Sequence, residues 1–310
     1  MAQSHERRSI SVVTPVYNGE ASVGELCRRL AEVLPHVSTE HEIILVNDGS
    51  RDRSWEMISE LCSRSPSVRG LNLMRNYGQH NALLCGIRAA KYDLVVTIDD
   101  DLQHPPEEIP RLLARLEEGF DVVYGAPTAE QNGLMRALAS RITRLALRPA
   151  VGSDVVKNVS AFRMFPTQLR DAFAAYESPF VSIDVLLTWA TTRFGATTVA
   201  FQPRHSGSSN YTFTKLLRHA LDMMTGFSTA PLQLASLIGF TCTLFGIGIF
   251  IYVFVRYCLE GSVPGFPFLA SIIAIFSGAQ LFALGVIGEY LARMHFRSMR
   301  RPAYVVRTTI

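Results

Sequence analysis

Two long uncharged segments near the end of the chain restrict its architecture more than any other feature. Residues Leu232–Val255 are uncharged over 24 residues, and Phe266–Ile287 are uncharged over 22. Each exceeds the roughly 20 apolar residues that a helix needs to cross a bilayer. The alternative is a pair of buried helices in a soluble domain. The pattern favours a transmembrane hairpin, over about 232–255 and 266–288.

Basic residues are distributed unevenly around this hairpin. The segment after it carries five basic side chains: Arg293, His295, Arg297, Arg300 and Arg301. The connection between the two segments carries Arg256, which is offset by Glu260. The positive-inside rule therefore predicts that both termini and the preceding domain lie in the cytoplasm. We expect a multi-pass protein of the inner (plasma) membrane.

Composition narrows the class of protein further. The net charge of +3 is mild and gives no case for a nucleic-acid partner. Residues 1–8 are polar and basic, and the apolar run that follows is too short for a signal peptide, so we expect none. The five cysteines include no CxxC pair, and we expect them to be reduced thiols.

The first half of the chain alternates mostly apolar strand-like runs with amphipathic helical segments. The predicted strands are 10–16, 42–47, 68–73, 94–98 and 121–124, and the predicted helices are 22–34, 54–63, 80–90 and 105–118. Such alternation is typical of a mostly parallel sheet with helices on both faces. We therefore expect an α/β domain, whose ligands bind beyond the carboxyl ends of the strands.

Polar residues gather where these strands end. The clusters are 17–20, 48–50, 75–80 and 99–104. In the last of them the apolar run 95–98 leads directly into Asp99, Asp100 and Asp101. Asp99 and Asp101 could give two oxygen ligands to one Mg²⁺ or Mn²⁺ ion, whereas Asp100 is expected to point away because side chains alternate. The alternative is a solvated turn that caps the next helix.

Three common motifs of nucleotide-binding and hydrolase sites do not occur in the sequence. It contains no GxGxxG fingerprint after the first strand, no GxxxxGK[ST] loop and no GxSxG elbow. The sheet therefore lacks the usual glycine cradle for phosphates. A divalent ion that bridges a diphosphate to Asp99 and Asp101 would serve the same purpose.

Three segments of the second half allow more than one interpretation. Residues 126–150 form a basic amphipathic stretch, either an ordinary surface helix or a cationic helix on an anionic membrane. Arg163 lies inside a hydrophobic run, so it needs a partner, which could be a structural carboxylate or a phosphate. Residues 203–211 suit a mobile polar loop or a plain linker, and 213–227 are predicted to lie at the membrane interface.

Four motifs together resemble those of family 2 glycosyltransferases with the GT-A fold. They are TPVYNGE (14–20), VNDGS (46–50), RNYGQH (75–80) and IDDDLQHPPE (98–107). The chain is most similar to the polyprenyl-phosphate glycosyltransferases of that family, a group that includes dolichyl-phosphate mannose synthases and bactoprenol glucosyltransferases. The resemblance extends over about residues 8–305 and includes the hairpin.

The resemblance implies a role for each residue that matches a family motif. Pro15, Tyr17, Glu20 and Asp48 would line the nucleobase and ribose pocket, with Arg75 also on the donor side. Asp99 would lie near the donor ribose or diphosphate, and Asp101 and Gln103 would bind Mg²⁺ or Mn²⁺. Arg163 and Arg204 would contact acceptor and donor phosphates, and Ser209 and Tyr211 would belong to a loop that closes over the site.

The resemblance also implies a domain organisation. A GT-A domain would span 1–205, followed by an active-site loop and juxtamembrane helix (206–228), the hairpin (229–292) and a basic cytoplasmic tail (293–310). Two positions depart from the family pattern. Ala161 stands where an acidic residue is frequent, and Asn210 stands where a lysine is frequent. These departures put the choice of substrate in question.

The implied reaction is an inverting transfer from a nucleotide sugar to a polyprenyl phosphate of the undecaprenyl type. A uridine diphosphate donor is favoured by the resemblance, with guanosine diphosphate second. Self-association follows only by analogy. A processive polysaccharide synthase is one alternative, but it would have more membrane helices and a QxxRW motif. A non-catalytic membrane scaffold is the other, motivated by Ala161 and Asn210.

Overall fold

The computed structural model describes residues 8–127, 159–202, 230–260 and 265–310. Its contacts divide the chain into two units, Met1–Leu216 with Arg300–Ile310, and Leu217–Met299. We call the first the α/β unit and the second the membrane unit, and each is described by itself. Several predicted features lie outside the described residues: most of the basic stretch 126–150, the segment 213–227, and the loop with Arg204, Ser209, Asn210 and Tyr211.

The α/β unit is built on a mixed sheet of eight strands among the described residues, in the order β7-β5-β6-β4-β1-β2-β3-β8. The strands are β1 (Ile10–Val16), β2 (His41–Asn47), β3 (Val68–Leu73), β4 (Leu94–Thr97), β5 (Val122–Pro127), β6 (Arg163–Pro166), β7 (Phe194–Val199) and β8 (Val306–Thr309). Strands β4, β1, β2 and β3 are mutually parallel, as are β5 and β7. Strand β6 runs antiparallel to β4 and β5, and β8 runs antiparallel to β3.

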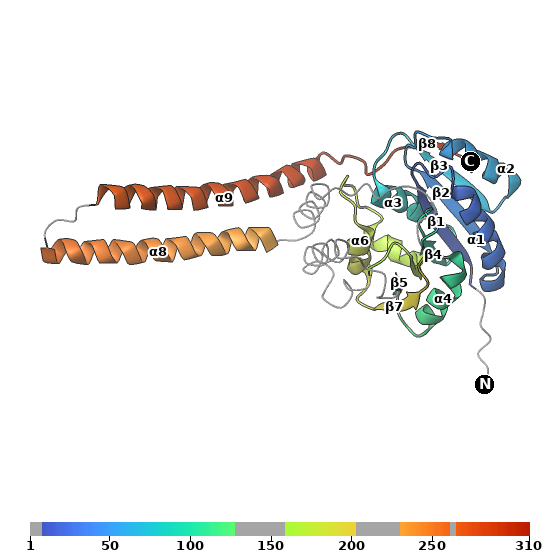
Figure 1. Cartoon of the computed structure of the whole chain (residues 1–310), viewed down its shortest axis with the longest axis horizontal. Helices are drawn as coiled ribbons and strands as arrows, with labels where there is room; N and C mark the ends of the chain where they lie inside the picture. Colours follow the sequence, from blue (N-terminus) through green and yellow to red (C-terminus); the bar gives the residue numbers. More distant parts are fainter. Residues whose placement is uncertain (1–7, 128–158, 203–229, 261–264) are drawn as a thin grey trace. The chain divides into compact units, whose positions relative to one another are not determined.

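Helices cover both faces of the sheet (Figure 1). They are α1 (Val23–Val37), α2 (Ser54–Arg64), α3 (Gln79–Ala89), α4 (Ile109–Glu117) and α6 (Ile183–Ala190), with 3₁₀ turns at Pro106–Glu108 and Thr167–Phe173. Side chains of α1, α2 and α4 share one core with Val12 of β1. Its neighbour Val13 points to the opposite face, where Gly86 of α3 approaches so closely that a Cβ would lie 2.3 Å from Val13 Cγ1. Alternation along a strand buried on both faces explains both contacts.

The predicted strands and helices of the first half are confirmed, with small shifts of their ends. Strands β6, β7 and β8 were not predicted. The structure differs from the expected basic tail at 293–310, because α9 continues to Ser298 and residues Val306–Thr309 form an edge strand. Two reciprocal hydrogen bonds between Gly70 and Ile310, each 2.9 Å, hold this edge. A short edge strand shows little hydrophobic periodicity, so β8 is difficult to predict from sequence.

Two long helices form the described part of the membrane unit, α8 (Ala230–Glu260) and α9 (Phe266–Ser298). By length and composition, Pro231–Leu259 and Ile275–His295 could each cross a membrane, and neither apolar window is buried. Helix α9 contains the whole of the predicted second segment, 266–288. The two helices approach closely at Gly246, where a Cβ would lie 2.9 Å from the ring of Phe276.

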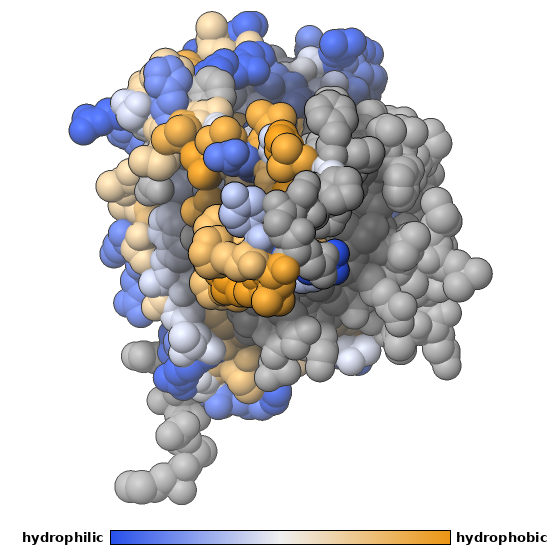
Figure 2. Space-filling view, turned by 90° about the vertical axis from the view of Figure 1, so that its left-hand side faces the viewer, coloured by the Kyte–Doolittle hydropathy of each residue, from blue (hydrophilic) through white to orange (hydrophobic). Residues whose placement is uncertain are grey.

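Large apolar side chains of α8 and α9 are exposed rather than packed inside, among them Phe240, Phe250 and Leu281. Figure 2 colours each residue by hydropathy, and hydrophobic residues at the surface are orange. A helix of a soluble core would hide such side chains, whereas a helix in lipid presents them outward. The alternative of two buried soluble helices does not fit this exposure.

Candidate active site

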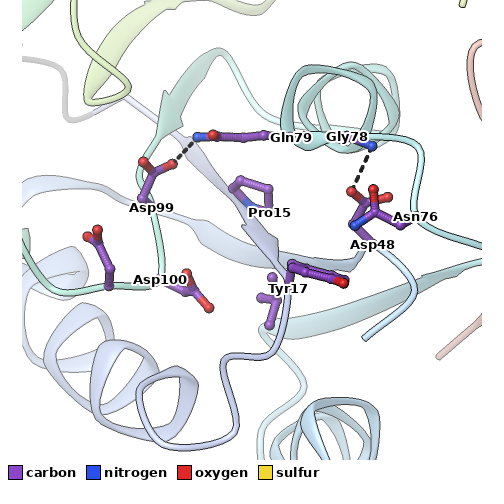
Figure 3. Close-up of a pocket in the computed structure, with 10 residues that line it drawn as sticks. Pro15, Tyr17, Asp48, Asn76, Gly78, Gln79, Asp99 and Asp100 are labelled. Atoms are coloured by element: carbon purple, nitrogen blue, oxygen red, sulfur yellow. Dashed lines mark hydrogen bonds between the residues drawn. The ribbon is translucent and has the colours of Figure 1, made fainter. Parts of the chain in front are cut away.

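A polar pocket opens where β1, β2 and β4 end (Figure 3). Its volume is about 270 Å³. Among the described residues it is lined by Pro15, Val16, Tyr17, Asp48, Asn76, Gly78, Gln79, Asp99, Asp100 and Asp101. The three strands are parallel neighbours, so their carboxyl ends, and the polar clusters that follow them, meet at one edge of the sheet.

Asp48 follows β2 and fixes the loop after β3. Its carboxylate accepts hydrogen bonds from the backbone N–H groups of Tyr77, at 2.7 Å, and Gly78, at 2.9 Å. Burial raises the pKa of Asp48, while these two N–H groups and the charge of Arg75 act in the opposite direction. The next residue, Gly49, has φ +64°, and a Cβ there would lie 2.5 Å from the backbone of Arg75. The sequence Asp48-Gly49 is thus what lets the two loops pack together.

The loop after β1 is fastened to the segment that follows Asp48. Asn18 N donates to Ser50 Oγ at 3.0 Å, and Arg51 N donates to Asn18 Oδ1 at 2.9 Å. These bonds hold Tyr17, which is 45% exposed, against the pocket. The structure places Glu20 elsewhere: its carboxylate accepts a bond from Arg53 N at 3.3 Å, and Glu20 is not among the described residues that line the pocket.

All three residues of the acidic cluster line the pocket, which corrects the expectation that Asp100 points away. Strand β4 ends at Thr97, so strict alternation no longer applies to the next residues. Asp100 Oδ2 lies so close to Gly19 that a Cβ there would be 1.9 Å away. Asp99 Oδ1 accepts a bond from Gln79 Nε2 at 2.7 Å, and Asp101 Oδ1 accepts one from Gln103 N at 3.1 Å.

The donor set of this pocket suits a hard divalent cation. Mg²⁺ and Mn²⁺ prefer oxygen ligands, and Mg²⁺ is usually bound by one or two carboxylates together with water and substrate phosphates. Asp99, Asp100 and Asp101 offer such carboxylates beside open volume. No cluster of three or more His, Cys, Asp or Glu that would enclose a metal occurs among the described residues. The arrangement therefore fits an ion shared with a phosphate ligand better than an all-protein cage.

Gln103, the other predicted metal ligand, is half-buried and is not among the described pocket residues. Its backbone accepts a hydrogen bond from Gln202 N at 2.9 Å. The neighbouring His104 is buried between the rings of Phe162 and Phe201, with centroids 5.5 and 5.3 Å away. Burial lowers the pKa of His104. These contacts anchor the end of the acidic loop in the interior.

Arg163 has a structural carboxylate as its partner. Its guanidinium is 2% exposed and forms an ion pair with Asp184, whose side chain is 7% exposed. Arg163 Nε also donates to Thr97 Oγ1 at 3.1 Å, and Tyr124 Oη donates to Asp184 Oδ1 at 3.0 Å. This corrects the expectation that Arg163 contacts a substrate phosphate, because the guanidinium lies in the core and does not line the pocket.

Arg75 is likewise outside the described lining of the pocket. Its guanidinium lies over the ring of Tyr77, 4.3 Å from the centroid. The structure therefore brings together Pro15, Tyr17, Asp48, Asp99 and Asp101 of the predicted site. Three lining residues were missed although they belong to the motif RNYGQH: Asn76, Gly78 and Gln79. Their position directly after a predicted strand was the available signal.

Curated relatives match this chain over nearly its full length. An undecaprenyl-phosphate 4-deoxy-4-formamido-L-arabinose transferase of Proteus mirabilis is 34% identical, with 100% of this chain and 96% of the relative covered. A transferase of the same name from Pseudomonas aeruginosa is 36% identical over 97% of this chain and 90% of its own.

Solved structures support the fold. Glucosyl-3-phosphoglycerate synthase of Mycobacterium tuberculosis, in complex with Mn²⁺, uridine diphosphate and phosphoglyceric acid, aligns with a TM-score of 0.51 at 20% identity. The alignment covers 70% of this chain and 76% of that one. A family model described as glycosyl transferase family 2 matches residues 11–174, which include the strand ends and all described pocket residues up to Asp101. The chain is therefore a membrane-associated glycosyltransferase whose α/β unit is a GT-A catalytic unit, and it belongs to glycosyltransferase family 2.

Proposed function

We propose that this protein transfers a sugar from a nucleotide diphosphate sugar, most simply a uridine diphosphate sugar, to undecaprenyl phosphate or a related polyprenyl phosphate. The observation that carries the proposal is the joining of two features in one chain. A carboxylate-lined pocket lies at the strand ends of a GT-A unit, and two apolar helices able to cross a bilayer follow it. The names of the curated relatives support the same acceptor.

The donor occupies the pocket in this proposal. Pro15, Tyr17 and Asp48 bind the nucleoside, because they line the wall formed by the ends of β1 and β2. Asp99 and Asp101 lie at the end of β4 and face the diphosphate. They would hold Mg²⁺ or Mn²⁺, with Gln103 as a further predicted ligand. The ion would supply charge stabilisation for the nucleoside diphosphate as it leaves.

The acceptor needs no strong general base. The second pKa of a phosphomonoester is about 6, so the group is largely a dianion at neutral pH. It can therefore attack the anomeric carbon directly. Ala161, which replaces a frequent acid of the family, is compatible with this reaction. A single in-line displacement inverts the anomeric centre. Arg204, Ser209 and Tyr211 remain predicted contacts to phosphates and to the bound donor.

The test is a donor screen with the full-length protein in lipid nanodiscs. Undecaprenyl phosphate and Mg²⁺ or Mn²⁺ are supplied with a panel of uridine and guanosine diphosphate sugars, and the lipid product is identified by mass spectrometry. We expect one donor to give a glycosylated lipid phosphate. Failure of every donor, with protein that stays folded, would contradict the proposal.

We also propose that the catalytic unit and both chain ends lie on the cytoplasmic side, with segment 206–228 at the interface. Cys258 near the end of α8 is exposed, whereas Cys27 and Cys85 are buried in the catalytic unit. An impermeant maleimide added outside intact cells should therefore label the protein through Cys258. Cys258→Ser should abolish this labelling, and persistent labelling of the variant would contradict the orientation.

A further inference from the structure

The start of α3 is held by two carboxylates of the pocket (Figure 3). Asp48 accepts the backbone N–H groups of Tyr77 and Gly78, directly before the helix begins. Asp99 accepts the side-chain amide of Gln79, the first residue of the helix, at 2.7 Å from Nε2 to Oδ1. One helix end thus connects the aspartate that follows β2 with an aspartate that follows β4.

The bond between Gln79 and Asp99 has a fixed direction. An ionised carboxylate has no hydrogen to donate, so the Gln79 amide presents its NH₂ group to Asp99. Hydrogen bonds to a charged acceptor are shorter and stronger than those between neutral groups. Gln79 therefore restrains the rotation of the Asp99 carboxylate, and Oδ1 is the oxygen it engages.

The backbone beneath Gln79 is well anchored. Helix α3 packs on the sheet through Gly86, where a Cβ would lie 2.3 Å from Val13 and 3.1 Å from Val46. Gly78, which precedes Gln79, has φ +98°, a conformation that suits glycine. Because the helix and the turn before it are both fixed, the Gln79 side chain reaches Asp99 from a constant position.

We propose that Gln79 is a positioning residue for donor binding. It orients Asp99 toward a nucleoside diphosphate and its divalent ion. This inference rests on the proposed nucleotide-sugar donor and extends it to a residue for which the sequence motifs implied no role. Gln79 acts through Asp99 rather than on the donor itself.

The experiment measures the affinity of the full-length protein for UDP in the presence of Mn²⁺ by calorimetry. Gln79→Met keeps the side-chain length and removes the NH₂ donor. We expect its dissociation constant to rise about 10-fold, from the loss of a hydrogen bond to a charged group. Gln79→Glu should bind more weakly still, because two carboxylates then face each other. The thermal midpoint should not change, since Gln79 is exposed.

A reciprocal exchange separates positioning from direct contact. Gln79→Glu combined with Asp99→Asn restores one amide and one carboxylate to the pair, with their places exchanged. We expect the dissociation constant of this double variant to rise by less than the product of the fold-increases measured for the two single variants. Gln168→Met, a substitution at an exposed glutamine of the turn Thr167–Phe173, serves as control and should bind UDP within about 2-fold of the wild type.

The outcomes are distinct. The role of Gln79 would be overturned if Gln79→Met bound UDP as tightly as the wild type. It would also be overturned if the double variant lost affinity by the full product of the two single fold-changes. Either result would leave the proposed function standing. A wild-type protein that binds neither UDP nor GDP with Mn²⁺ would overturn the donor assignment, and this inference with it.

Discussion

Two groups of charged side chains flank the same strand end and are treated by the fold in opposite ways. Asp99, Asp100 and Asp101 follow β4 and line an open pocket, each partly exposed. Arg163 contacts the last residue of β4, Thr97, and pairs with Asp184, and both charged side chains are almost completely buried. The first group places negative charge where a ligand can enter. The second encloses opposite charges in contact with each other.

The difference follows from the cost of burying charge. An isolated ion in the interior is unfavourable by several kcal/mol, so a buried arginine needs a partner and further hydrogen bonds. For Arg163, the partner is Asp184, and Thr97 Oγ1 accepts a further hydrogen bond. The ring of Tyr124 lies 5.9 Å from the guanidinium. Carboxylates gathered in a solvated pocket remain available to a cation. We therefore expect the pocket group to govern activity and the buried group to govern stability.

The largest effect on activity is expected from Asp101→Ala. Loss of this carboxylate from the pocket should lower turnover by at least about 100-fold, the usual scale for removing an electrostatic contact to developing charge. Transfer of labelled sugar to polyprenyl phosphate measures it. The thermal midpoint should stay near that of the wild type. Asp171→Ala, at an exposed position of the turn Thr167–Phe173, is the matched control and should keep full activity.

The largest effect on stability is expected from Asp184→Ala, which leaves the Arg163 charge buried without its carboxylate. Breaking such a pair costs about 3–5 kcal/mol, visible as a lowered thermal midpoint in detergent. Replacing both residues, by Arg163→Met with Asp184→Leu, should recover most of the stability. If the double variant is stable but inactive, Arg163 acts on a substrate after all, and the division between the two groups fails.

A smaller effect is expected from Thr97→Val, because Thr97 is the residue that links the two groups. Thr97 Oγ1 donates to Ala161 O at 2.6 Å and accepts from Arg163 Nε at 3.1 Å. Losing both bonds in the interior should cost about 1–3 kcal/mol of unfolding free energy. Thr198→Val, at an exposed position of β7, should cost less than about 0.5 kcal/mol. A large loss of donor affinity in Thr97→Val would show that the buried group also shapes the pocket.

The smallest effect on stability is expected at a partly exposed ion pair, Arg29 with Glu107. The side chain of Glu107 is 50% exposed. The hydrogen bond from Arg29 lowers the pKa of Glu107. A depressed carboxyl pKa contributes stability above the unfolded value of about 4.3, and this is lost as the pH falls through the folded pKa. Glu107→Gln should therefore cost less than about 1 kcal/mol at pH 7, and less at pH 3 than at pH 7. Equal losses at both pH values would contradict an electrostatic origin.

Much of the fold was readable from local patterns. The parallel strands β1, β2 and β4 are buried almost throughout on both faces, so they appear as mostly apolar runs. The two membrane-length segments are equally evident from their lack of charge. The later strands were missed because their pairing is non-local: β6 lies between β4 and β5, and β8 pairs with β3 although more than 230 residues separate Leu73 from Val306.

The pocket was predicted in part. Asp48, Asp99 and Asp101 follow strands, so the sequence located them correctly at one edge of the sheet. Asp100 was misjudged, because the strand ends before it. Arg163 was assigned to a substrate by resemblance, whereas its partner Asp184 is 21 residues away and carries no motif. Gln79 stands in a recognisable motif, but its bond to Asp99 depends on how the start of α3 is placed beside the loop that follows β4.

The sequence by itself determined the class of protein: a mostly parallel α/β domain with acidic strand ends, followed by a membrane hairpin. Apolar periodicity and the length of uncharged runs are local properties, and they suffice for these conclusions. Tertiary structure alone decided which charged groups face the pocket and which pair in the core. That distinction depends on burial and on partners distant in sequence, because the fate of a charge is set by the groups that surround it once the chain has folded.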